Sequence, residues 1–271
     1  MNLDREPLPS RVDGLPPLSP AALAGLQSGL EALGLADLAE GSRLALVDHL
    51  RLLVAWNRSI NLSAIRDPEV AVRAHILDSL SAVAVLREHG IDALLDLGSG
   101  AGYPGLPLAV VLPARRCLLV ESVTKKSAFL AAAVAVVAGR TAAAERIDVF
   151  NGRAEVLAAD RAHRERWPAV VARAIAPLAG LAELALPLVA RGGLLVAWKR
   201  RSLEVELAIA RPVVAMLGGG PPRVVDTTVD GLQDHVLVVV EKIGPTPAGY
   251  PRDPAQRLRR ARAMHERLPS A

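Results

Sequence analysis

The two apolar runs nearest the end of the chain constrain the fold most, because only four residues separate them. Residues 222–229 (PRVVDTTV) and 234–242 (DHVLVVVEK) flank the connector Asp230–Gln233. A parallel crossover needs a dozen or more residues, so these runs can pair only as an antiparallel hairpin. Helical stretches separate five earlier apolar runs, which indicates βαβ units and a parallel sheet. These earlier runs are 92–97, 116–121, 146–150, 169–174 and 193–198.

Composition divides the chain into four segments. Residues 1–19 form a flexible, proline-rich leader that we expect to add nothing to the core. Residues 20–90 predict N-terminal helices packed on the core, with patterns near 20–34, 41–57 and 68–88; Asp67 and Pro68 suit the start of the third. Residues 91–244 form the α/β core, and 245–271 a basic C-terminal tail. An apolar content of 51% is enough for one large core.

The net charge of +4 is concentrated at the C-terminal end of the chain. From Pro245 onward six arginines face only Asp253 and Glu266, so this tail carries the whole excess and the rest of the chain is neutral. Such a distribution favours an anionic partner, most simply nucleic acid, although a solvated basic tail is the alternative. The arginines are Arg252, Arg257, Arg259, Arg260, Arg262 and Arg267.

Several classes of protein are disfavoured. The single cysteine, Cys117, cannot form an intramolecular disulfide and fits a reducing compartment. The first ten residues lack the pattern of a secretory signal, and the longest apolar run, 128–139, is too short to span a bilayer. We therefore expect a cytoplasmic protein with no membrane partner. The six histidines show no metal-binding spacing, so no metal is expected.

A glycine-rich loop follows the first strand of the predicted sheet. Residues 96–105 (DLGSGAGYPG) place Gly98, Gly100 and Gly102 between that strand and a helical run. Glycines let the backbone turn tightly and approach a ligand at the carboxyl end of the strand. The dinucleotide spacing G-x-G-x-x-G would need glycine at Tyr103, so the spacing instead suits the methionine end of S-adenosylmethionine. A tight turn without a ligand is the alternative.

Glu121 ends the next strand, about twenty residues beyond the loop. A carboxylate at that position can accept hydrogen bonds from both ribose hydroxyls of an adenosine, although it could also simply face water. The loop and Glu121 together indicate an adenosine cofactor. The glycine spacing and the terminal hairpin favour S-adenosylmethionine over NAD, because five parallel strands followed by a hairpin are the architecture of Rossmann-like methyltransferases.

Several ordered motifs resemble one family, the glucose-inhibited division protein B family of 16S rRNA guanine-N7 methyltransferases. The resemblance runs from about Gly41 to Lys242, with a weaker match at 250–252. It implies a seven-strand Rossmann-like S-adenosylmethionine-dependent methyltransferase with a helical N-terminal extension, acting on 16S rRNA or the small ribosomal subunit. Besides the glycine loop, the matching segments are 56–62 (WNRSINL), 66–69 (RDPE), 75–79 (HILDS), 122–126 (SVTKK) and 173–174 (RA).

The resemblance also assigns residues. Gly98 and Tyr103 match cofactor-loop contacts, Ala154 and Glu155 match an adenine-side pair, and Arg173 matches a pocket arginine. Asn61 and His75 match positions near the substrate mouth, although His75 taken alone favours a structural role, capping or packing among its apolar neighbours. We assign Arg153, Arg173 and Lys199 to phosphate or O6 contact and cofactor positioning. Where the family has Lys-Gly, this chain has Lys199 and Arg200, which puts substrate-side contacts in doubt.

The resemblance implies a mechanism without acid–base catalysis. N7 of guanine has a free lone pair and no proton, so it can attack the methyl group directly, and the enzyme works mainly by alignment. Two alternatives remain: a methyltransferase acting on another RNA, a protein or a small molecule, and a catalytically silent RNA-binding protein. The sequence leaves open the modified guanine, the assembly stage of the RNA and the oligomeric state, for which a monomer is our expectation.

Overall fold

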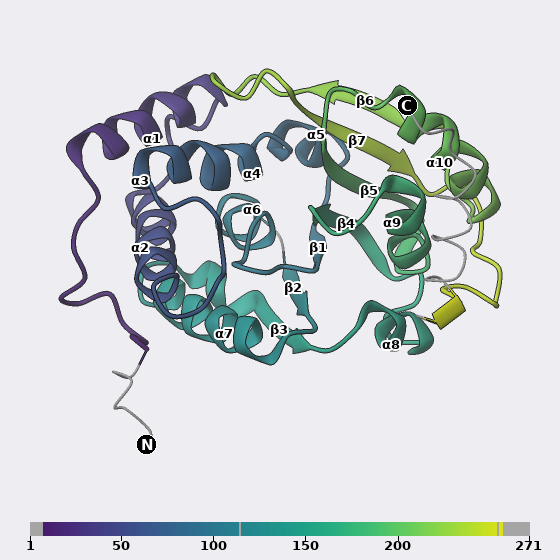
Figure 1. The fold of residues 1–271 in the computed structure, drawn as a ribbon, viewed down its shortest axis with the longest axis horizontal. Helices are drawn as coiled ribbons and strands as arrows, with labels where there is room; N and C mark the ends of the chain where they lie inside the picture. Colours follow the sequence, from purple (N-terminus) through teal and green to yellow (C-terminus); the bar gives the residue numbers. More distant parts are fainter. Residues whose placement is uncertain (1–7, 114, 254, 257–271) are drawn as a thin grey trace.

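The computed structural model describes residues 8–113, 115–253 and 255–256, which form one seven-strand sheet between two layers of helices (Figure 1). The strand order is β3-β2-β1-β4-β5-β7-β6. Strands β1 to β5 are parallel, and β7 is antiparallel to both β5 and β6, so the predicted terminal hairpin is confirmed. The strands are β1 (Ala93–Leu97), β2 (Arg116–Glu121), β3 (Ile147–Asn151), β4 (Trp167–Arg173), β5 (Val189–Arg200), β6 (Arg223–Asp226) and β7 (His235–Glu241).

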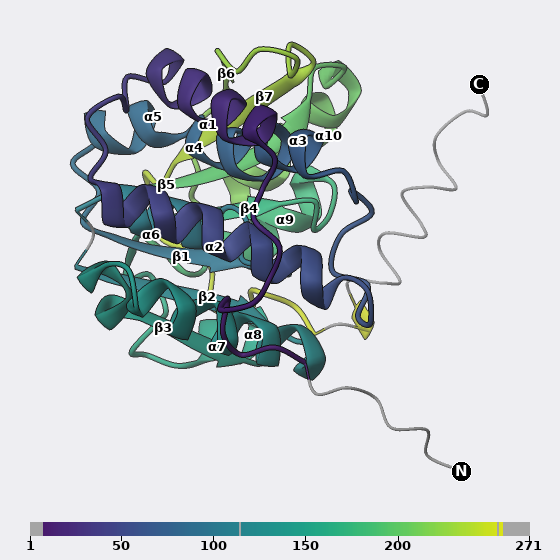
Figure 2. The same cartoon turned by 90° about the vertical axis from the view of Figure 1, so that its left-hand side faces the viewer.

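Each face of the sheet has its own apolar core and its own layer of helices. Figure 2 looks onto the first layer, in which α2 lies beside α7. That layer contains α1 (Pro20–Ala32), α2 (Glu40–Trp56), α3 (Pro68–Ala71), η1 (Val72–Leu77), α4 (Asp78–Leu80), α5 (Val83–Glu88), α6 (Gly105–Val111), α7 (Thr124–Ala138) and η2 (Ala142–Arg146). The second contains α8 (Ala154–Ala159), α9 (Leu178–Ala185) and α10 (Glu204–Met216).

The third predicted helix, 68–88, is interrupted. Its start is confirmed, because the Asp67 carboxylate accepts hydrogen bonds from Glu69 N (2.8 Å) and Val70 N (3.1 Å) ahead of Pro68. The segment η1, however, is a π-helix, and a turn at residues 81–82 precedes α5. A π-helical turn widens the helix and is frequent at functional sites. The prediction of one continuous helix over residues 68–88 is therefore wrong.

Residues 8–18 lie against the first layer. The Arg51 side chain donates to the carbonyl of Pro16 (3.0 Å), and the Trp56 indole donates to the carbonyl of Pro9 (2.7 Å). Val12 and Leu18 are buried in the first core. The expectation that the leader adds nothing to the core is therefore wrong for these residues, because two side chains of α2 supply donors to its proline-rich backbone.

The segment after β7 is anchored to the second layer. Lys242 is fully buried and donates to the carbonyls of Leu186 (2.7 Å) and Leu217 (3.2 Å). Arg252 pairs with the buried carboxylate of Glu183. Arg252 is thus part of the folded body rather than of a free tail. The other tail arginines lie outside the described residues: Arg257, Arg259, Arg260, Arg262 and Arg267.

Candidate active site

The parallel strands bring most of the predicted residues to one edge of the sheet. The register pairs Leu97 with Val120 and with Ala172, so the carboxyl ends of β1, β2 and β4 are neighbours. Ligands of open α/β sheets bind outside this edge. The predicted residues found there are Gly98, Gly100, Gly102, Tyr103, Glu121, Arg153, Ala154, Glu155, Arg173 and Lys199.

The three glycines of the loop after β1 all have left-handed backbone conformations, with φ of 67° at Gly98, 57° at Gly100 and 83° at Gly102. A Cβ on Gly98 would lie 2.9 Å from Ile175, and one on Gly102 would lie 3.1 Å from the ring of His49. These two glycines permit close packing. Among the described residues a Cβ on Gly100 would meet nothing nearer than the Gly98 carbonyl at 3.8 Å, so the backbone of Gly100 has open space beside it.

Glu121 joins this loop to the end of β2. One carboxylate oxygen accepts from Gly100 N (3.0 Å) and the other from Val123 N (2.7 Å), and the residue is buried. Each oxygen has a second lone pair available for another donor. Glu121 therefore holds the loop in place and can still accept hydrogen bonds from a ligand's hydroxyl groups. The structure excludes the alternative that Glu121 merely faces water.

Asp96 is a buried carboxyl group below the loop to which the sequence gave no separate role. Its Oδ2 accepts from Gly105 N (3.0 Å), whereas Oδ1 has no hydrogen-bond partner within the described part of the chain. Burial raises the pKa of Asp96 to about 7, against the opposing effects of the Gly105 amide and Ser99. In the sequence, only its position as the first residue of the glycine motif could have indicated that Asp96 belongs to this site.

Three rings stack beside the glycine loop. Tyr103 lies between His49 (centroid distance 4.4 Å) and His75 (4.9 Å). His49 Nε2 also contacts the carbonyl of Ala101 (2.8 Å), which is 52 residues away in sequence. Burial lowers the pKa of each histidine to about 4, and Arg173 contributes to the shift at His75. Both rings are therefore neutral at physiological pH.

Both ring nitrogens of His75 have polar partners. The guanidinium of Arg173 lies 3.4 Å from Nδ1, and Ser63 Oγ lies 2.8 Å from Nε2. Ser63 lies in the loop between α2 and α3, which the side chain of Asn57 organises by bonding Ser63 O (2.7 Å) and Leu62 N (2.9 Å). His75 therefore connects this loop to the end of β4.

Arg173 belongs to a buried polar cluster that also includes Asp78 and His235. Asp78 Oδ2 accepts from Arg173 (2.9 Å), and Oδ1 lies 3.0 Å from His235 Nδ1. Arg173 also donates to the carbonyl of Ala74 in the π-helix (2.8 Å). The sequence placed Asp78 in a matching motif without a role and did not single out His235. No local pattern could have found this pair, because they are 157 residues apart.

Lys199 holds the turn that follows Arg173. Its ammonium donates to the carbonyl of Ala176 (2.8 Å) and to Glu206 (2.6 Å). Ala174 in this turn has a φ of 57°, which residues other than glycine rarely adopt. The neighbouring Arg200 is exposed and pairs with Asp234 instead. Lys199, which matches the family pattern, therefore supports this turn, whereas Arg200, which stands where the family has glycine, lies at the surface.

Two predicted residues are not drawn into these contacts. Asn61 lies exposed in the loop between α2 and α3, and Arg153 lies exposed just before α8. Ala154 is buried and Glu155 is half-buried in the first turn of α8.

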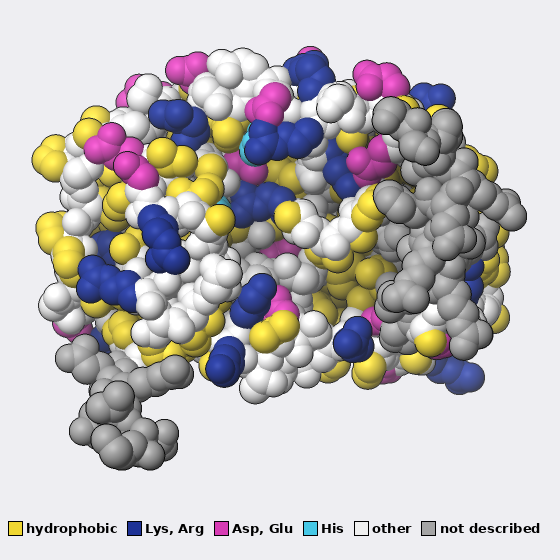
Figure 3. Space-filling view, viewed as in Figure 1, with side chains coloured by type: hydrophobic (Ala, Val, Ile, Leu, Met, Phe, Trp, Pro, Cys, Tyr) yellow, Lys and Arg dark blue, Asp and Glu magenta, His cyan; other side chains and the backbone are white. Residues whose placement is uncertain are grey.

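Figure 3 shows lysines and arginines distributed around the middle of the face seen in Figure 1. Exposed basic residues near the carboxyl edge include Arg58 and Arg66 in the loop between α2 and α3, and Lys125 in the first turn of α7.

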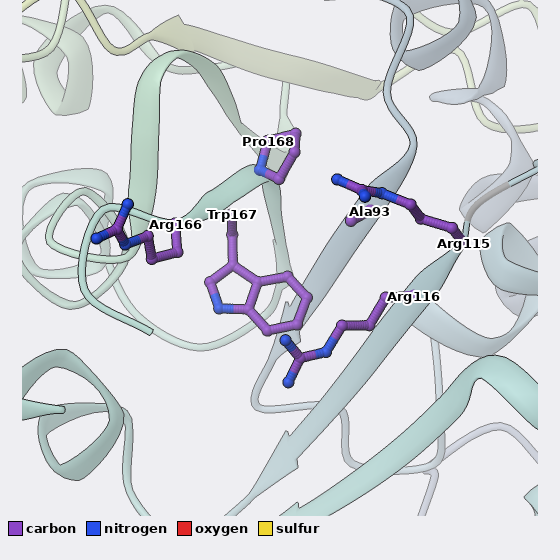
Figure 4. Close-up of a pocket in the computed structure, with 6 residues that line it drawn as sticks. All are labelled: Ala93, Arg115, Arg116, Arg166, Trp167 and Pro168. Carbon is purple, nitrogen blue, oxygen red and sulfur yellow. The ribbon is translucent and has the colours of Figure 1, made fainter. Parts of the chain in front are cut away.

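A surface pocket lies at the opposite edge of the sheet (Figure 4). Its lining includes Ala93, Arg116 and Trp167, which are the first residues of β1, β2 and β4. The Arg116 guanidinium lies 4.6 Å from the centre of the Trp167 ring. This pocket is therefore separate from the glycine loop and Glu121.

In the described ranges no group of three His, Cys, Asp or Glu side chains is arranged to hold a metal ion, and no helix there could cross a membrane.

Comparison with known proteins identifies the family. The model of the GidB family, described as rRNA small subunit methyltransferase G, matches residues 43–233. The chain belongs to this family. The ribosomal RNA small subunit methyltransferase G of Roseiflexus sp. (strain RS-1) is 44% identical over 74% of this chain and 83% of the relative. The protein of the same name from Symbiobacterium thermophilum is 39% identical over 84% of this chain and 92% of its own length.

Family membership confirms several predictions. The chain is a methyltransferase of the small-subunit rRNA, its cofactor is S-adenosylmethionine, and its fold is Rossmann-like. Among solved structures, a putative O-methyltransferase from Klebsiella pneumoniae is 15% identical over 86% of this chain and 94% of its own, with a TM-score of 0.46. That likeness is too low to bear on the substrate.

Proposed function

We propose that the protein transfers the methyl group of S-adenosylmethionine to N7 of a guanine in 16S rRNA, at the carboxyl edge of β1, β2 and β4. The observation that carries this proposal is the bond between Glu121 and the amide of Gly100, with open space beside that glycine. An acidic residue after the second strand, beside a glycine turn after the first, is the arrangement that binds an adenosine.

The residues at this edge fit the cofactor. In the proposal, Glu121 accepts from the ribose hydroxyls, and the backbone of 98–102 accommodates the methionine end. Tyr103 borders the same loop. Ala154 and Glu155 lie beyond the neighbouring strand β3 and would border the adenine, while Arg173 would line the pocket. When bound, S-adenosylmethionine supplies a methyl group on a positively charged sulfur.

The chain's own residues suit a reaction that needs no proton transfer. The N7 lone pair forms a bond to the methyl carbon while the carbon–sulfur bond breaks, so positive charge moves from sulfur to the purine. With a pKa lowered to about 4 by burial, His75 is a weak base and adds no positive charge to the site. The contribution of the protein is alignment of the reacting atoms, which can lower a barrier by about 7–11 kcal/mol in favourable cases.

Substrate contacts are proposed for four residues. Asn61 and Arg153 are exposed near this edge, where they could bind RNA, and His75 faces the stack with Tyr103. A donor from Arg153, or from Lys199 after it exchanges one of its present acceptors, would select guanine, because guanine presents an acceptor at O6 where adenine presents an amino donor. Basic residues around this face and the C-terminal arginines would bind phosphates.

The wider context follows from the substrate. We propose that residues 1–19 are a leader, 20–90 form the helical wall of the substrate side, 91–244 carry the cofactor and 245–271 contact RNA. Contacts such as His75–Arg173 and Asp78–Arg173 support the second assignment, because they join the N-terminal helices to the end of β4. The protein would act as a monomer in the cytoplasm, which light scattering and fractionation can check.

The decisive experiment supplies purified protein with labelled S-adenosylmethionine and 16S rRNA, either naked or in 30S subunits from cells lacking this modification. We expect one methyl group per RNA, at a guanine where reduction and aniline treatment cleave the chain, which is the chemistry of N7-methylguanine. Transfer to another base atom would contradict the N7 assignment. Labelling of a protein or small molecule but not of RNA would favour the alternative substrates.

A further inference from the structure

Asp78 gathers contacts from three strands at the edge of the proposed site. Its two carboxylate oxygens lie 2.9 Å from Arg173 of β4 and 3.0 Å from His235 of β7. Its backbone carbonyl accepts from the indole of Trp198 in β5 (2.7 Å). Asp78 is almost completely buried, and it belongs to the N-terminal helices rather than to the sheet. Asp78 therefore contacts Arg173 and His235 through its side chain and Trp198 through its backbone.

Arg173 is the group of this cluster that faces the glycine loop. Its guanidinium lies 5.7 Å from the centre of the Tyr103 ring, and it follows Ala172, the residue paired with Leu97 just before Gly98. The carbonyl of Ala74 and the carboxylate of Asp78 both accept from the same guanidinium nitrogen. The arginine is thus held in one position next to the loop.

The charge of Arg173 is a difficulty for the proposed ligand. The methyl donor carries a positive sulfur, and like charges repel strongly in partly buried surroundings. His75, beside Arg173, is kept neutral because burial lowers its pKa to about 4. In this cluster Asp78 is the carboxylate that pairs directly with Arg173. Without it, the arginine would present an uncompensated charge to the site.

We propose that Asp78 is a positioning residue that fixes Arg173 beside the cofactor loop and cancels its charge, so that the site accepts the positive sulfur of the methyl donor. This inference rests on the proposed placement of the cofactor at this edge. It predicts a specific binding property: Asp78 supports the affinity for S-adenosylmethionine, whose sulfur is charged, more than the affinity for S-adenosylhomocysteine, whose sulfur is neutral.

The test is the ratio of the two affinities, measured by calorimetry without RNA. In Asp78→Asn the preference for S-adenosylmethionine over S-adenosylhomocysteine should fall roughly tenfold, the size expected for one charge acting over about 10 Å in partly buried protein. In Arg173→Gln the preference should rise, because Asp78 loses its cation. The double variant restores neutrality, so its ratio should return toward the wild-type value.

Asp48→Asn is the matched control. Asp48 is equally buried and pairs with two arginines, Arg51 and Arg140, both at 2.7 Å, but it lies in α2 and does not contact the loop. We expect this variant to lose stability on thermal unfolding while its affinity ratio stays unchanged. A merely structural role for Asp78 would give the same result in Asp78→Asn.

An affinity ratio within twofold of the wild type in folded Asp78→Asn would overturn the proposal. If that variant does not fold, Arg173→Gln decides alone, and an unchanged ratio there overturns it. A wild-type protein that binds both ligands but does not methylate 16S rRNA would refute the substrate assignment and leave this inference standing. A wild-type protein that binds neither ligand would overturn both.

Discussion

Glu121→Gln tests the cofactor site most directly. The carboxylate receives two backbone donors, Gly100 N at 3.0 Å and Val123 N at 2.7 Å. An amide offers one oxygen, so one of these N–H groups would face an NH2 group instead. Hydrogen bonds to a charged group contribute about 1.5–3 kcal/mol and neutral ones about 0.5–1.5. With one buried donor left unpaired, unfolding free energy should fall by about 2–4 kcal/mol.

The same substitution should weaken the binding of S-adenosylmethionine by about 1–3 kcal/mol, because the ribose loses a charge-assisted hydrogen bond. The dissociation constant should therefore rise roughly 5- to 150-fold. Titration calorimetry measures this effect, and filter binding of 16S rRNA should be nearly unchanged. Glu183→Gln is the control, since that buried glutamate pairs with Arg252 away from the loop. Weakened RNA binding with unchanged cofactor affinity would refute the reasoning and move Glu121 to the substrate side.

Three further outcomes are expected. Gly100→Val should abolish cofactor binding in calorimetry while circular dichroism shows a folded protein, because a branched side chain would fill the open space and strain a φ of 57°; unchanged affinity would place the cofactor elsewhere. Truncation after Gln256, which spares the Arg252–Glu183 pair, should lower the slope of log K against log salt for RNA binding by roughly 2 if about half of the removed arginines contact phosphates; an unaltered slope would make the tail a solvated extension. Asp96 has a pKa of about 7, so folding binds a proton and wild-type stability falls as pH rises from about 4 to 7. Asp96→Asn has no group that titrates there, so between pH 4 and 7 its unfolding free energy should rise relative to that of the wild type by on the order of 3–4 kcal/mol. Urea unfolding at several pH values measures this difference. A difference that stays constant with pH would contradict the raised pKa.

The sequence determined the features that depend on neighbouring residues. The spacing of Gly98, Gly100 and Gly102 predicted a tight turn, and the structure has the positive φ that glycine allows at all three. Asp67 before Pro68 predicted a capped helix start, and the short connector before residue 234 required an antiparallel hairpin. Each of these follows from backbone geometry over a few residues, which the sequence encodes directly.

Periodicity was less informative where packing overrides local preference. The pattern of 68–88 predicted one helix, but the chain forms a π-helical turn at η1 that turns the carbonyl of Ala74 toward Arg173. The proline-rich leader has few large apolar groups, yet Arg51 and Trp56 supply hydrogen-bond donors to its backbone and Val12 is buried. In both places a distant partner supplies the stabilising contact.

Only the tertiary structure determined which distant groups meet. His49 reaches the glycine loop from α2, and Asp78 joins residues of β4, β5 and β7. Those meetings depend on the strand order, which places β4 beside β1 and inserts β7 next to β5. The burial that gives His75 a pKa of about 4, and Asp96 one of about 7, arises from the same packing. Desolvation depends on all the atoms that surround a group, most of them far away in the chain.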